Sequence, residues 1–199
     1  MTLPPLNKER TTKMADNKVR YGLENVYIAL KTDDGYETPV HIPGAVNLTA
    51  DPEGDQSKFY ADDIPYVTFT SNSGYTGELE MALIPDEILK KILNFGVDTK
   101  SVVYEDASAA PAPFALLYEV KGDAKKRRNI FYNVTAARPS NEYSTTEDSI
   151  EPQTETLEIT MIPATIGDLT ITRASCDSDS AAYTDWFTKV YEPTVAPTV

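Results

Sequence analysis

The stretch GYTGELEMALIPDEILKKIL, residues 74–93, decides the fold that this sequence predicts. In its first half, polar and apolar residues alternate, a period of two that is typical of a half-buried β-strand. The apolar face carries Tyr75, Gly77, Leu79, Met81 and Leu83, and the polar face carries Thr76, Glu78 and Glu80. Pro85 ends the predicted strand, because proline has no N–H to donate to a sheet.

A short amphipathic helix is predicted directly after this strand. Asp86 and Glu87 place negative charge where a helix N-terminus favours it, and two lysines follow near the other end. The apolar residues at 88, 89, 92 and 93 recur at helical spacing. Such a helix can fold back over the apolar face of the strand, so we expect this unit at the centre of one β-rich domain.

Runs on both sides of the unit predict further strands, because they alternate or are apolar and are bounded by turn residues. These runs are 26–31, 40–42 with a continuation at 46–48, 114–121, 128–137, 154–162 and 169–171. The runs 114–121 and 128–137 form a hairpin and are apolar on both faces, so we expect both faces to be covered. The predicted loops are 51–58, 94–113 and 140–149.

A second helix is predicted near the C-terminal end, where Asp179 or Ser180 supplies the N-cap. Its apolar stripe holds Tyr183, Trp186, Phe187 and Val190. The expected fold class is therefore mainly β, a β-sandwich or barrel with one short flanking α-helix and a C-terminal α-helix. We expect a flexible N-terminal arm at 1–17, a β domain at 18–191 and a C-terminal tail at 192–199.

Charge is divided unevenly along the chain, which has a formal net charge of −13. The first twenty residues hold five of the 18 basic residues and two of the 31 acidic ones, which leaves 13 basic against 29 acidic residues, about −16, in the remainder. Such a body repels nucleic acid unless a basic face is segregated from it. No apolar run approaches the ~20 residues of a membrane span, so we expect no membrane partner and synthesis in the cytosol.

The residue inventory gives little support to catalysis or to a metal site. His41 is the single histidine, and no flanking motif supplies a partner for nucleophilic catalysis, so a structural or surface role is favoured. Cys176 is the single cysteine, which excludes an internal disulfide and favours a buried bystander over a zinc ligand. No phosphate-binding glycine loop or dinucleotide motif is present. The sequence therefore predicts no enzyme, no cofactor and no metal ion.

Acidic clusters at 51–55 and 62–63 and the basic run 125–128 are candidates for contacts with other copies of the chain. The acidic clusters lack the ligand spacing of a calcium loop, so solvated loops or subunit contacts are favoured over calcium sites. The basic run is either a soluble hairpin tip or a salt-bridging contact with an acidic loop of a neighbouring copy. The candidate contact residues are Asp51, Glu53, Asp55, Phe59, Tyr60, Asp62, Asp63, Lys125, Lys126, Arg127 and Arg128.

Six segments stand in a recognisable order and spacing along the chain. They are VRYGLENV at 19–26, IPGAVNL at 42–48, FYADD at 59–63, GYTGELE at 74–80, DSIEPQT at 148–154 and WF at 186–187. Taken together, they resemble the major tail protein, or tail-tube protein, of long-tailed, siphovirus-type phages of Gram-positive bacteria. The similarity covers roughly residues 18–191, and the chain departs from the family in its first thirteen residues, which such proteins usually lack.

The resemblance implies a tail-tube fold, with two packed β-sheets and a flanking helix, in which subunits assemble as stacked hexameric rings. Strands of neighbouring copies would join into one β-barrel around a channel that conducts DNA without binding it specifically. The implied partners are the tape-measure protein and other tail proteins, and the implied location is the virion, after assembly in the host cytoplasm. From the residues alone, 75–84 and 114–137 are equal candidates for the barrel wall and for the core sheet behind it.

Two other functions stay open on the sequence. The tube subunit of a contractile secretion system shares the fold, and neighbouring genes separate the two, because a tape-measure gene marks one and a secretion cluster the other. The third candidate is a β-sandwich protein that binds or hydrolyses carbohydrate, which glycan binding or turnover by a monomer would favour.

Removal of residues 1–17 is expected to shorten or abolish tubes, because an arm outside the folded domain is free to reach a neighbouring copy. The circular dichroism of the shortened monomer should match that of the full chain. Tube lengths are measured by electron microscopy, and tubes of normal length would show that the arm is dispensable.

Overall fold

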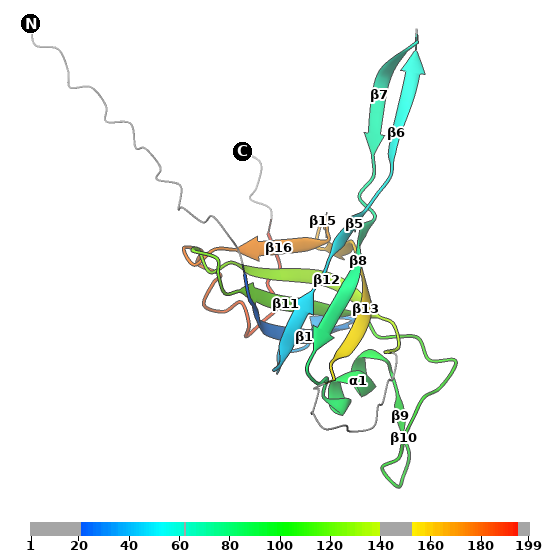
Figure 1. Cartoon of the computed structure of the whole chain (residues 1–199), viewed down its shortest axis with the longest axis vertical. Coiled ribbons are helices and arrows are strands. Elements are labelled where there is room, and N and C mark those ends of the chain that lie inside the picture. The colour runs from blue at the N-terminus through cyan, green and yellow to red at the C-terminus, as the bar shows by residue number, and fades with distance from the viewer. Residues whose placement is uncertain (1–20, 62, 140–152, 195–199) are drawn as a thin grey trace, which may run out of the picture.

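The computed structural model describes residues 21–61, 63–139 and 153–194, and within them it consists mainly of strands with one short helix (Figure 1). The elements are β1 (Leu23–Thr32), β2 (Gly35–Tyr36), β3 (Val40–Ile42), β4 (Ala45–Leu48), β5 (Asp51–Glu53), β6 (Gln56–Ala61), β7 (Ile64–Thr70), β8 (Gly74–Met81), α1 (Asp86–Ile92), β9 (Gly96–Val97), β10 (Val103–Tyr104), β11 (Phe114–Val120), β12 (Arg128–Ala136), β13 (Glu155–Ile162), β14 (Ala164–Ile166), β15 (Leu169–Ile171) and β16 (Arg173–Cys176). The mainly-β prediction is confirmed. The arm at 1–17, the loop at 140–149 and most of the tail lie outside the described residues. No helix in the described ranges is long and apolar enough to cross a membrane.

The strand and helix predicted at 74–93 are present as β8 and α1. Leu79 and Met81 are buried, as the alternation predicts, and the acidic and basic residues of α1 lie in its first and last turns. The placement of Leu83 on the apolar face was wrong, since its side chain is 65% exposed. β8 ends at Met81, and the N–H of Ile84 donates to a Glu155 carboxylate oxygen at 2.7 Å, so the alternation stops before it reaches Leu83.

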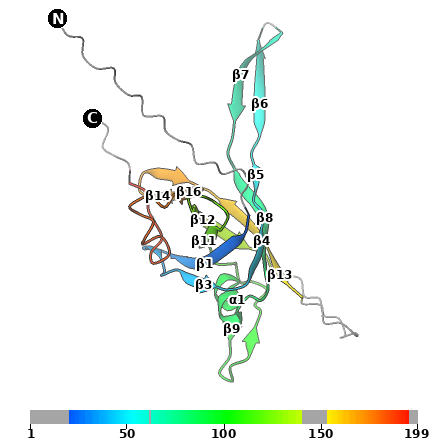
Figure 2. The same cartoon turned by 60° about the vertical axis from the view of Figure 1, so that its left-hand side comes forward.

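Ten strands form one sheet in the order β2-β1-β11-β12-β13-β8-β4, with β3 beside β1, β5 beside β8 and β16 beside β12. β12 is the junction, because residues 128–131 pair with β16 and residues 133–136 pair with β13. β13 and β8 therefore lie over one face of β1, β11 and β12 and enclose a core there, while β16 contributes to the core on the other face (Figure 2). Where the resemblance implied two packed sheets, one large sheet folds over its own inner face, with three two-stranded sheets beside it.

Apolar side chains pack on both faces of the β11–β12 hairpin. The inner core holds Val26, Ile28, Ile42, Leu79, Met81, Ile84, Ile88, Ile92, Leu93, Phe114, Leu116, Phe131, Val134, Ala136, Leu157, Ile159 and Met161. The outer core holds Ala29, Ala115, Leu117, Ile130, Tyr132, Ala164, Cys176, Trp186 and Val190. The prediction that both faces of this hairpin are covered is confirmed, since α1 and β8 lie on the inner core and the C-terminal segment lies on the outer one.

The predicted C-terminal α-helix is absent from the described residues, and a succession of turns occupies 178–188 instead. Most of their local backbone hydrogen bonds span three residues, such as those from Ser180 N–H to Asp177 C=O at 2.9 Å and from Tyr183 N–H to Ser180 C=O at 3.1 Å. Hydroxyl groups of this segment also bond to nearby backbone, a competition that makes serine and threonine poor helix residues. The Thr188 hydroxyl, for example, donates to the Asp185 carbonyl at 2.8 Å. Trp186 is nevertheless buried in the outer core.

The prediction of a loop at 51–58 was also wrong, because β5 and the start of β6 occupy it. Asp51 lies opposite Thr76 and Glu53 opposite Gly74, so backbone pairing with β8 holds a segment whose composition disfavours a strand. Pro52 is tolerated there because β5 is an edge strand and needs no N–H on its outer side.

Substitution of Leu79 by alanine is expected to lower the free energy of unfolding by about 2–5 kcal/mol, because the fully buried side chain leaves a cavity. Glu78→Ala on the neighbouring, exposed position is the matched control and should change it by less than about 0.5 kcal/mol. Chemical denaturation of dilute protein measures both values. Equal effects of the two substitutions would contradict the assignment of faces in β8.

Candidate assembly surface

The outer face of β8 and β13 is open and carries only polar residues at its paired positions. Thr76 lies opposite Thr160, Glu78 opposite Glu158 and Glu80 opposite Thr156, while Leu79 and Leu157 point to the inner core. The alternation of each strand thus leaves a band of threonine and glutamate across the sheet. We call this surface the Thr/Glu face.

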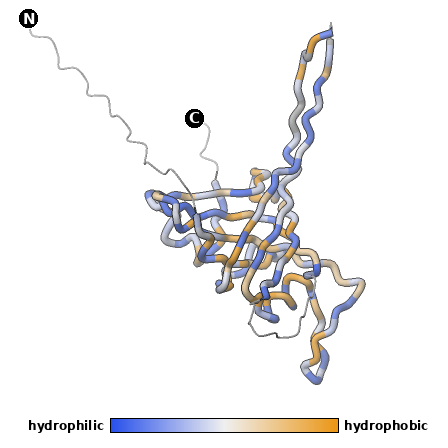
Figure 3. The backbone as a smooth tube through the Cα atoms, in the orientation of Figure 1, coloured by the Kyte–Doolittle hydropathy of each residue, from blue (hydrophilic) through white to orange (hydrophobic). Residues whose placement is uncertain are grey.

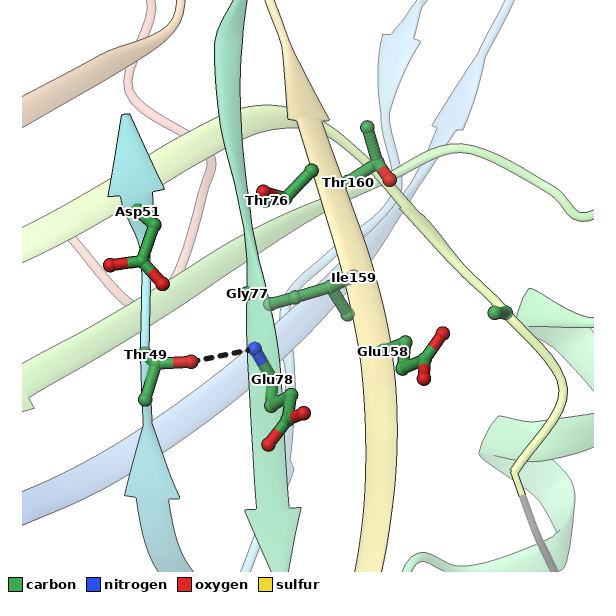
Figure 4. Close-up of a pocket in the computed structure, with 9 residues that line it drawn as sticks. Thr49, Asp51, Thr76, Gly77, Glu78, Glu158, Ile159 and Thr160 are labelled. Carbon is green, nitrogen blue, oxygen red and sulfur yellow. Dashed lines mark hydrogen bonds between the residues drawn. The ribbon is translucent and has the colours of Figure 1, made fainter. Parts of the chain in front are cut away.

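A shallow hollow lies in the Thr/Glu face between β8, β13 and the segment that joins β4 to β5 (Figure 4). Its lining includes the carboxylates of Asp51, Glu78 and Glu158 and has no basic side chain. The Thr49 hydroxyl oxygen accepts a hydrogen bond from the Glu78 N–H at 2.9 Å, which ties this segment to β8. A Cβ at Gly77 would lie 2.1 Å from the Thr49 carbonyl oxygen, so only glycine permits this close approach.

The electrostatic character of the Thr/Glu face follows from this arrangement. Glu78 and Glu158 are like charges directly opposite each other, a pairing that destabilises a sheet unless the strands are held for another reason. Threonine hydroxyls partly offset the charge nearby: Thr76 donates to Glu53 at 3.1 Å and Thr154 donates to Glu80 at 2.7 Å. The face therefore repels phosphate groups and offers no stacking or basic group to nucleic acid.

The strands β6 and β7 form a hairpin that projects from the body as a two-stranded ribbon (Figure 1). At its base, Ser71 N–H donates to Asp55 C=O and Ser73 N–H donates to Glu53 C=O, both at 2.9 Å. These bonds hold the connection from β5 to β6 beside the connection from β7 to β8 where the ribbon leaves the body. Beyond the base, neither outer edge of the ribbon pairs with another strand of the described chain. We call this element the β6–β7 ribbon.

Large apolar side chains are exposed along the β6–β7 ribbon, and Figure 3 shows hydrophobic stretches close to its tip. They are Phe59, Tyr60, Ile64, Tyr66 and Val67, with 58% of Phe59 and 70% of Tyr66 accessible. An isolated two-stranded hairpin is marginally stable in water, and a contiguous exposed apolar patch marks a contact surface. The ribbon therefore has the properties of an element that is stabilised by contact with another molecule.

A second, smaller hairpin projects at the other end of the molecule, where a loop was predicted (Figures 1 and 2). β9 pairs with β10, and the Asp98 carboxylate closes the turn by accepting hydrogen bonds from the N–H groups of Lys100 and Val102 at 2.8 and 2.7 Å. Its exposed apolar side chains are Val97, Val102, Val103 and Tyr104. We call this element the β9–β10 hairpin.

The basic run at the tip of β11–β12 is mostly paired within the chain. Arg127 and Lys125 contact the Asp177 carboxylate at 3.0 and 3.4 Å, and the Arg127 hydrogen bond holds the pKa of Asp177 below its ordinary value. Lys126 is exposed, with a φ of 48°. The run therefore fastens the C-terminal segment to the hairpin tip.

Arg128 occupies a different environment, half-buried beneath the C-terminal segment. Its Nε donates to Glu119 at 3.1 Å, its Nη1 donates to the Tyr183 carbonyl oxygen, and its guanidinium lies 3.7 Å from the centre of the Tyr183 ring. Glu119 is only 6% exposed and also accepts a hydrogen bond from Asn25 at 3.3 Å. A buried carboxylate needs a paired charge, so the contacts of Arg128 with Glu119 and Tyr183 hold the C-terminal segment against the outer core.

The single histidine and the single cysteine lie on different strands, β3 and β16. His41 is exposed on β3 with its ring centre 4.8 Å from that of Tyr27. Cys176 is buried, and burial raises the pKa of its thiol, which lowers its reactivity. In the described ranges, no group of three or more histidine, cysteine, aspartate or glutamate side chains is placed to hold a metal ion.

The sequence-predicted contact residues fall into three places. Asp51, Glu53 and Asp55 are exposed at the base of the β6–β7 ribbon, Phe59, Tyr60 and Asp63 are on the ribbon, and the basic run is on the β11–β12 tip. Asp62 lies outside the described residues. Sequence reasoning missed Ile64, Tyr66 and Val67, although apolar residues on both sides of Asp62-Asp63 signalled a hairpin. It also missed the four apolar residues of the β9–β10 hairpin, whose strands are too short to show a period.

Substitution of Arg128 by alanine is expected to lower the free energy of unfolding of the monomer by roughly 3 kcal/mol, because it leaves the buried Glu119 carboxylate unpaired. Lys126→Ala, two positions away and exposed, is the control and should stay within about 0.5 kcal/mol. Urea denaturation gives both values. An Arg128→Ala monomer of unchanged stability would show that the side chain acts elsewhere, for instance between copies.

No family model and no curated protein matches the chain. Solved structures that are similar to it in shape include the following two. One is described as the baseplate of the anti-feeding prophage, symmetrised six-fold, with 8% identity, a TM-score of 0.43, and coverage of 90% of this chain and 100% of that one. The other is described as the cap that terminates the tube of the anti-feeding prophage, with 9% identity, a TM-score of 0.42, and coverage of 84% and 99%. At such low identity and TM-score, the function is inferred from the residues of this chain alone.

Proposed function

We propose that this chain is a structural subunit of a phage tail tube, in which copies close into hexameric rings, the rings stack, and DNA passes through the central channel during ejection. Two neighbouring features carry the proposal. One is the open, acidic and threonine-rich face of β8 and β13, and the other is the ribbon that projects next to it, with unpaired edges and exposed aromatic side chains. The chain has a structural role in this proposal and performs no catalytic step.

The strand edges supply the means of association. The two strands of the ribbon offer backbone N–H and C=O groups on their outer sides, with no partner strand there in the described chain. Such edges pair with a strand of another copy, because main-chain hydrogen bonds then replace bonds to water. Repetition of the same contact around an axis closes a ring, and the paired strands then form its wall.

The division of faces supports β8 and β13 as the strands of that wall in our proposal. β11 and β12 are buried on both faces, so they belong to the core behind it. β8 and β13 bury one face and leave the Thr/Glu face open. With this face turned inward, the channel repels the phosphate backbone, and DNA slides through without specific binding.

The proposal places the protein in the virion, after assembly in the host cytoplasm, with the tape-measure protein and other tail proteins as partners. A tube subunit of a contractile secretion system would need the same ring. The two uses are distinguished by the neighbouring genes, since a tape-measure gene accompanies the first and a secretion cluster the second.

Negative-stain electron microscopy of the purified full chain at increasing concentration tests the proposal. Rings or tubes of uniform width with a central bore are expected. The double variant Glu78→Gln/Glu158→Gln should assemble at least as well as the unaltered chain, because it removes a like-charge pair without altering an edge. A protein that stays strictly monomeric at high concentration, or that binds or cleaves a glycan as a monomer, would overturn it.

A further inference from the structure

We infer that the segment Leu3-Pro4-Pro5-Leu6 docks into an apolar groove between β1 and β4 of its own chain. The lining of this groove includes Tyr21, Leu23, Val46, Leu48, Tyr118 and Val120, and we call it the β1–β4 groove. The occupant belongs to the same molecule, so the inference concerns the separate monomer. It goes beyond the proposed function and does not rest on it.

The β1–β4 groove lies where two neighbouring strands run side by side without pairing. β3 pairs with β1 at residues 26–28, but β4, the next strand, pairs with β8 on one side and with no strand of the described chain on the other. The start of β1 is irregular, with a register shift between Glu24 and Tyr27 and a φ of 54° at Asn25. A groove of about 360 Å³ lies between the two strands, a size typical of ligand pockets.

The lining of the β1–β4 groove is apolar, and none of its side chains is charged. Leu23, Leu48 and Tyr118 are half-buried and pack against the inner core, so they form a fixed floor. Tyr21 is 67% exposed and Val46 is 49% exposed. Exposed apolar side chains around such a floor mark a contact surface, and the two tyrosines add aromatic rings to it.

The sequence of residues 1–20 contains one segment that suits this lining. Leu3-Pro4-Pro5-Leu6 is the longest apolar run among these residues and holds the only two consecutive prolines of the chain. Proline-rich segments favour the polyproline II conformation, which aromatic-lined grooves recognise. The two prolines have no N–H to satisfy, so the segment does not depend on pairing with the edge of β4.

The charges around the groove favour the same occupant. The charged residues next to the lining, along the chain or opposite it in the sheet, are Glu24, Asp51, Glu80, Glu119, Lys121 and Arg128. Glu24 pairs with Lys121, and Glu119 pairs with Arg128. The remaining carboxylates, Asp51 and Glu80, make the surroundings acidic. Residues 7–20 carry five basic and two acidic side chains, so they are attracted to these surroundings.

The length of the connection makes the groove of the same chain the preferred one. Tyr21 lines the groove, so the arm begins beside it, and the fourteen residues 7–20 are ample for a return. A flexible tether of this kind holds a segment at an effective concentration on the order of millimolar, above that of other copies in dilute solution. A four-residue segment buries little area, so docking is reversible and the arm stays available to a neighbouring copy at high concentration.

Disulfide formation within the dilute full-length monomer tests the inference. In a Cys176→Ala background, Asn7→Cys is placed beside the docking segment and Asn47→Cys beside the groove. Diamide takes up the two electrons and two protons that the thiols lose. The intramolecular disulfide is expected to form at least ~10-fold faster than in the matched protein with Asn7→Cys and Val40→Cys, because docking brings only the first pair of thiols together. Val40 is exposed on β3, outside the groove.

A second control keeps both cysteines and the tether. Leu3→Ser/Leu6→Ser, added to the Asn7→Cys/Asn47→Cys protein, removes the apolar side chains of the segment and should lower the rate to that of the Val40→Cys protein. Equal rates in all three proteins would overturn the inference. A disulfide that forms only between copies would also overturn it, because the groove would then take the arm of another molecule.

Nuclear magnetic resonance of the full chain gives a readout without cysteines. The backbone amide signals of Leu23, Val46 and Leu48 are expected to differ between the unaltered chain and the Leu3→Ser/Leu6→Ser variant, since only the unaltered chain fills the groove. The signals of Val97 and Val102, on the β9–β10 hairpin, should coincide. Identical groove signals in the two proteins would contradict docking. Both experiments use monomers, whereas the proposed function is tested by rings and tubes, so either idea can fail without the other.

Discussion

Burial of the β11–β12 hairpin on both faces is the constraint on which the rest of this structure depends. A hairpin that is apolar on both sides needs a separate cover for each face. The sheet itself supplies one cover, because the change of partner along β12 brings β13 and β8 over the inner core. The C-terminal segment supplies the other, and Arg128 and Glu119 hold it there through a half-buried ion pair. The hydrophobic stabilisation of the chain is thus concentrated in one compact body.

Because the hydrophobic stabilisation comes from this body, the surfaces outside the two cores are available for contacts with other molecules. β8 and β13 have already buried their apolar faces, so their outer faces carry threonine and glutamate without cost to the core. The apolar side chains of the β6–β7 ribbon and the β9–β10 hairpin lie outside both cores, where their exposure costs free energy in water. In the proposed tube, burial of these side chains between copies recovers that free energy, and a net charge of −13 opposes non-specific association of separate copies.

Local sequence patterns predicted the elements well where periodicity and burial agree, and less well elsewhere. The alternation around Leu79 and the two-sided apolar runs of the 114–137 hairpin were correctly interpreted, because each pattern has one structural solution. The prediction of a C-terminal α-helix was wrong. The apolar spacing that suits a helix also suits successive turns, and the Ser and Thr hydroxyls of this segment favour the turns. Asp51 to Glu53 was read as a loop because its composition disfavours a strand, while pairing with β8 holds it as one.

By itself, the sequence determined the mainly-β class, the central strand–helix unit and the acidic character of the body, because these depend on local periodicity and composition. Only the tertiary structure decided that Arg128 pairs with Glu119 inside the chain, although it belongs to an exposed-looking basic run. It also decided that two hairpins with exposed apolar side chains, β6–β7 and β9–β10, project from opposite ends. The physical reason is that burial is a property of contacts between residues far apart in the chain, which no local pattern contains.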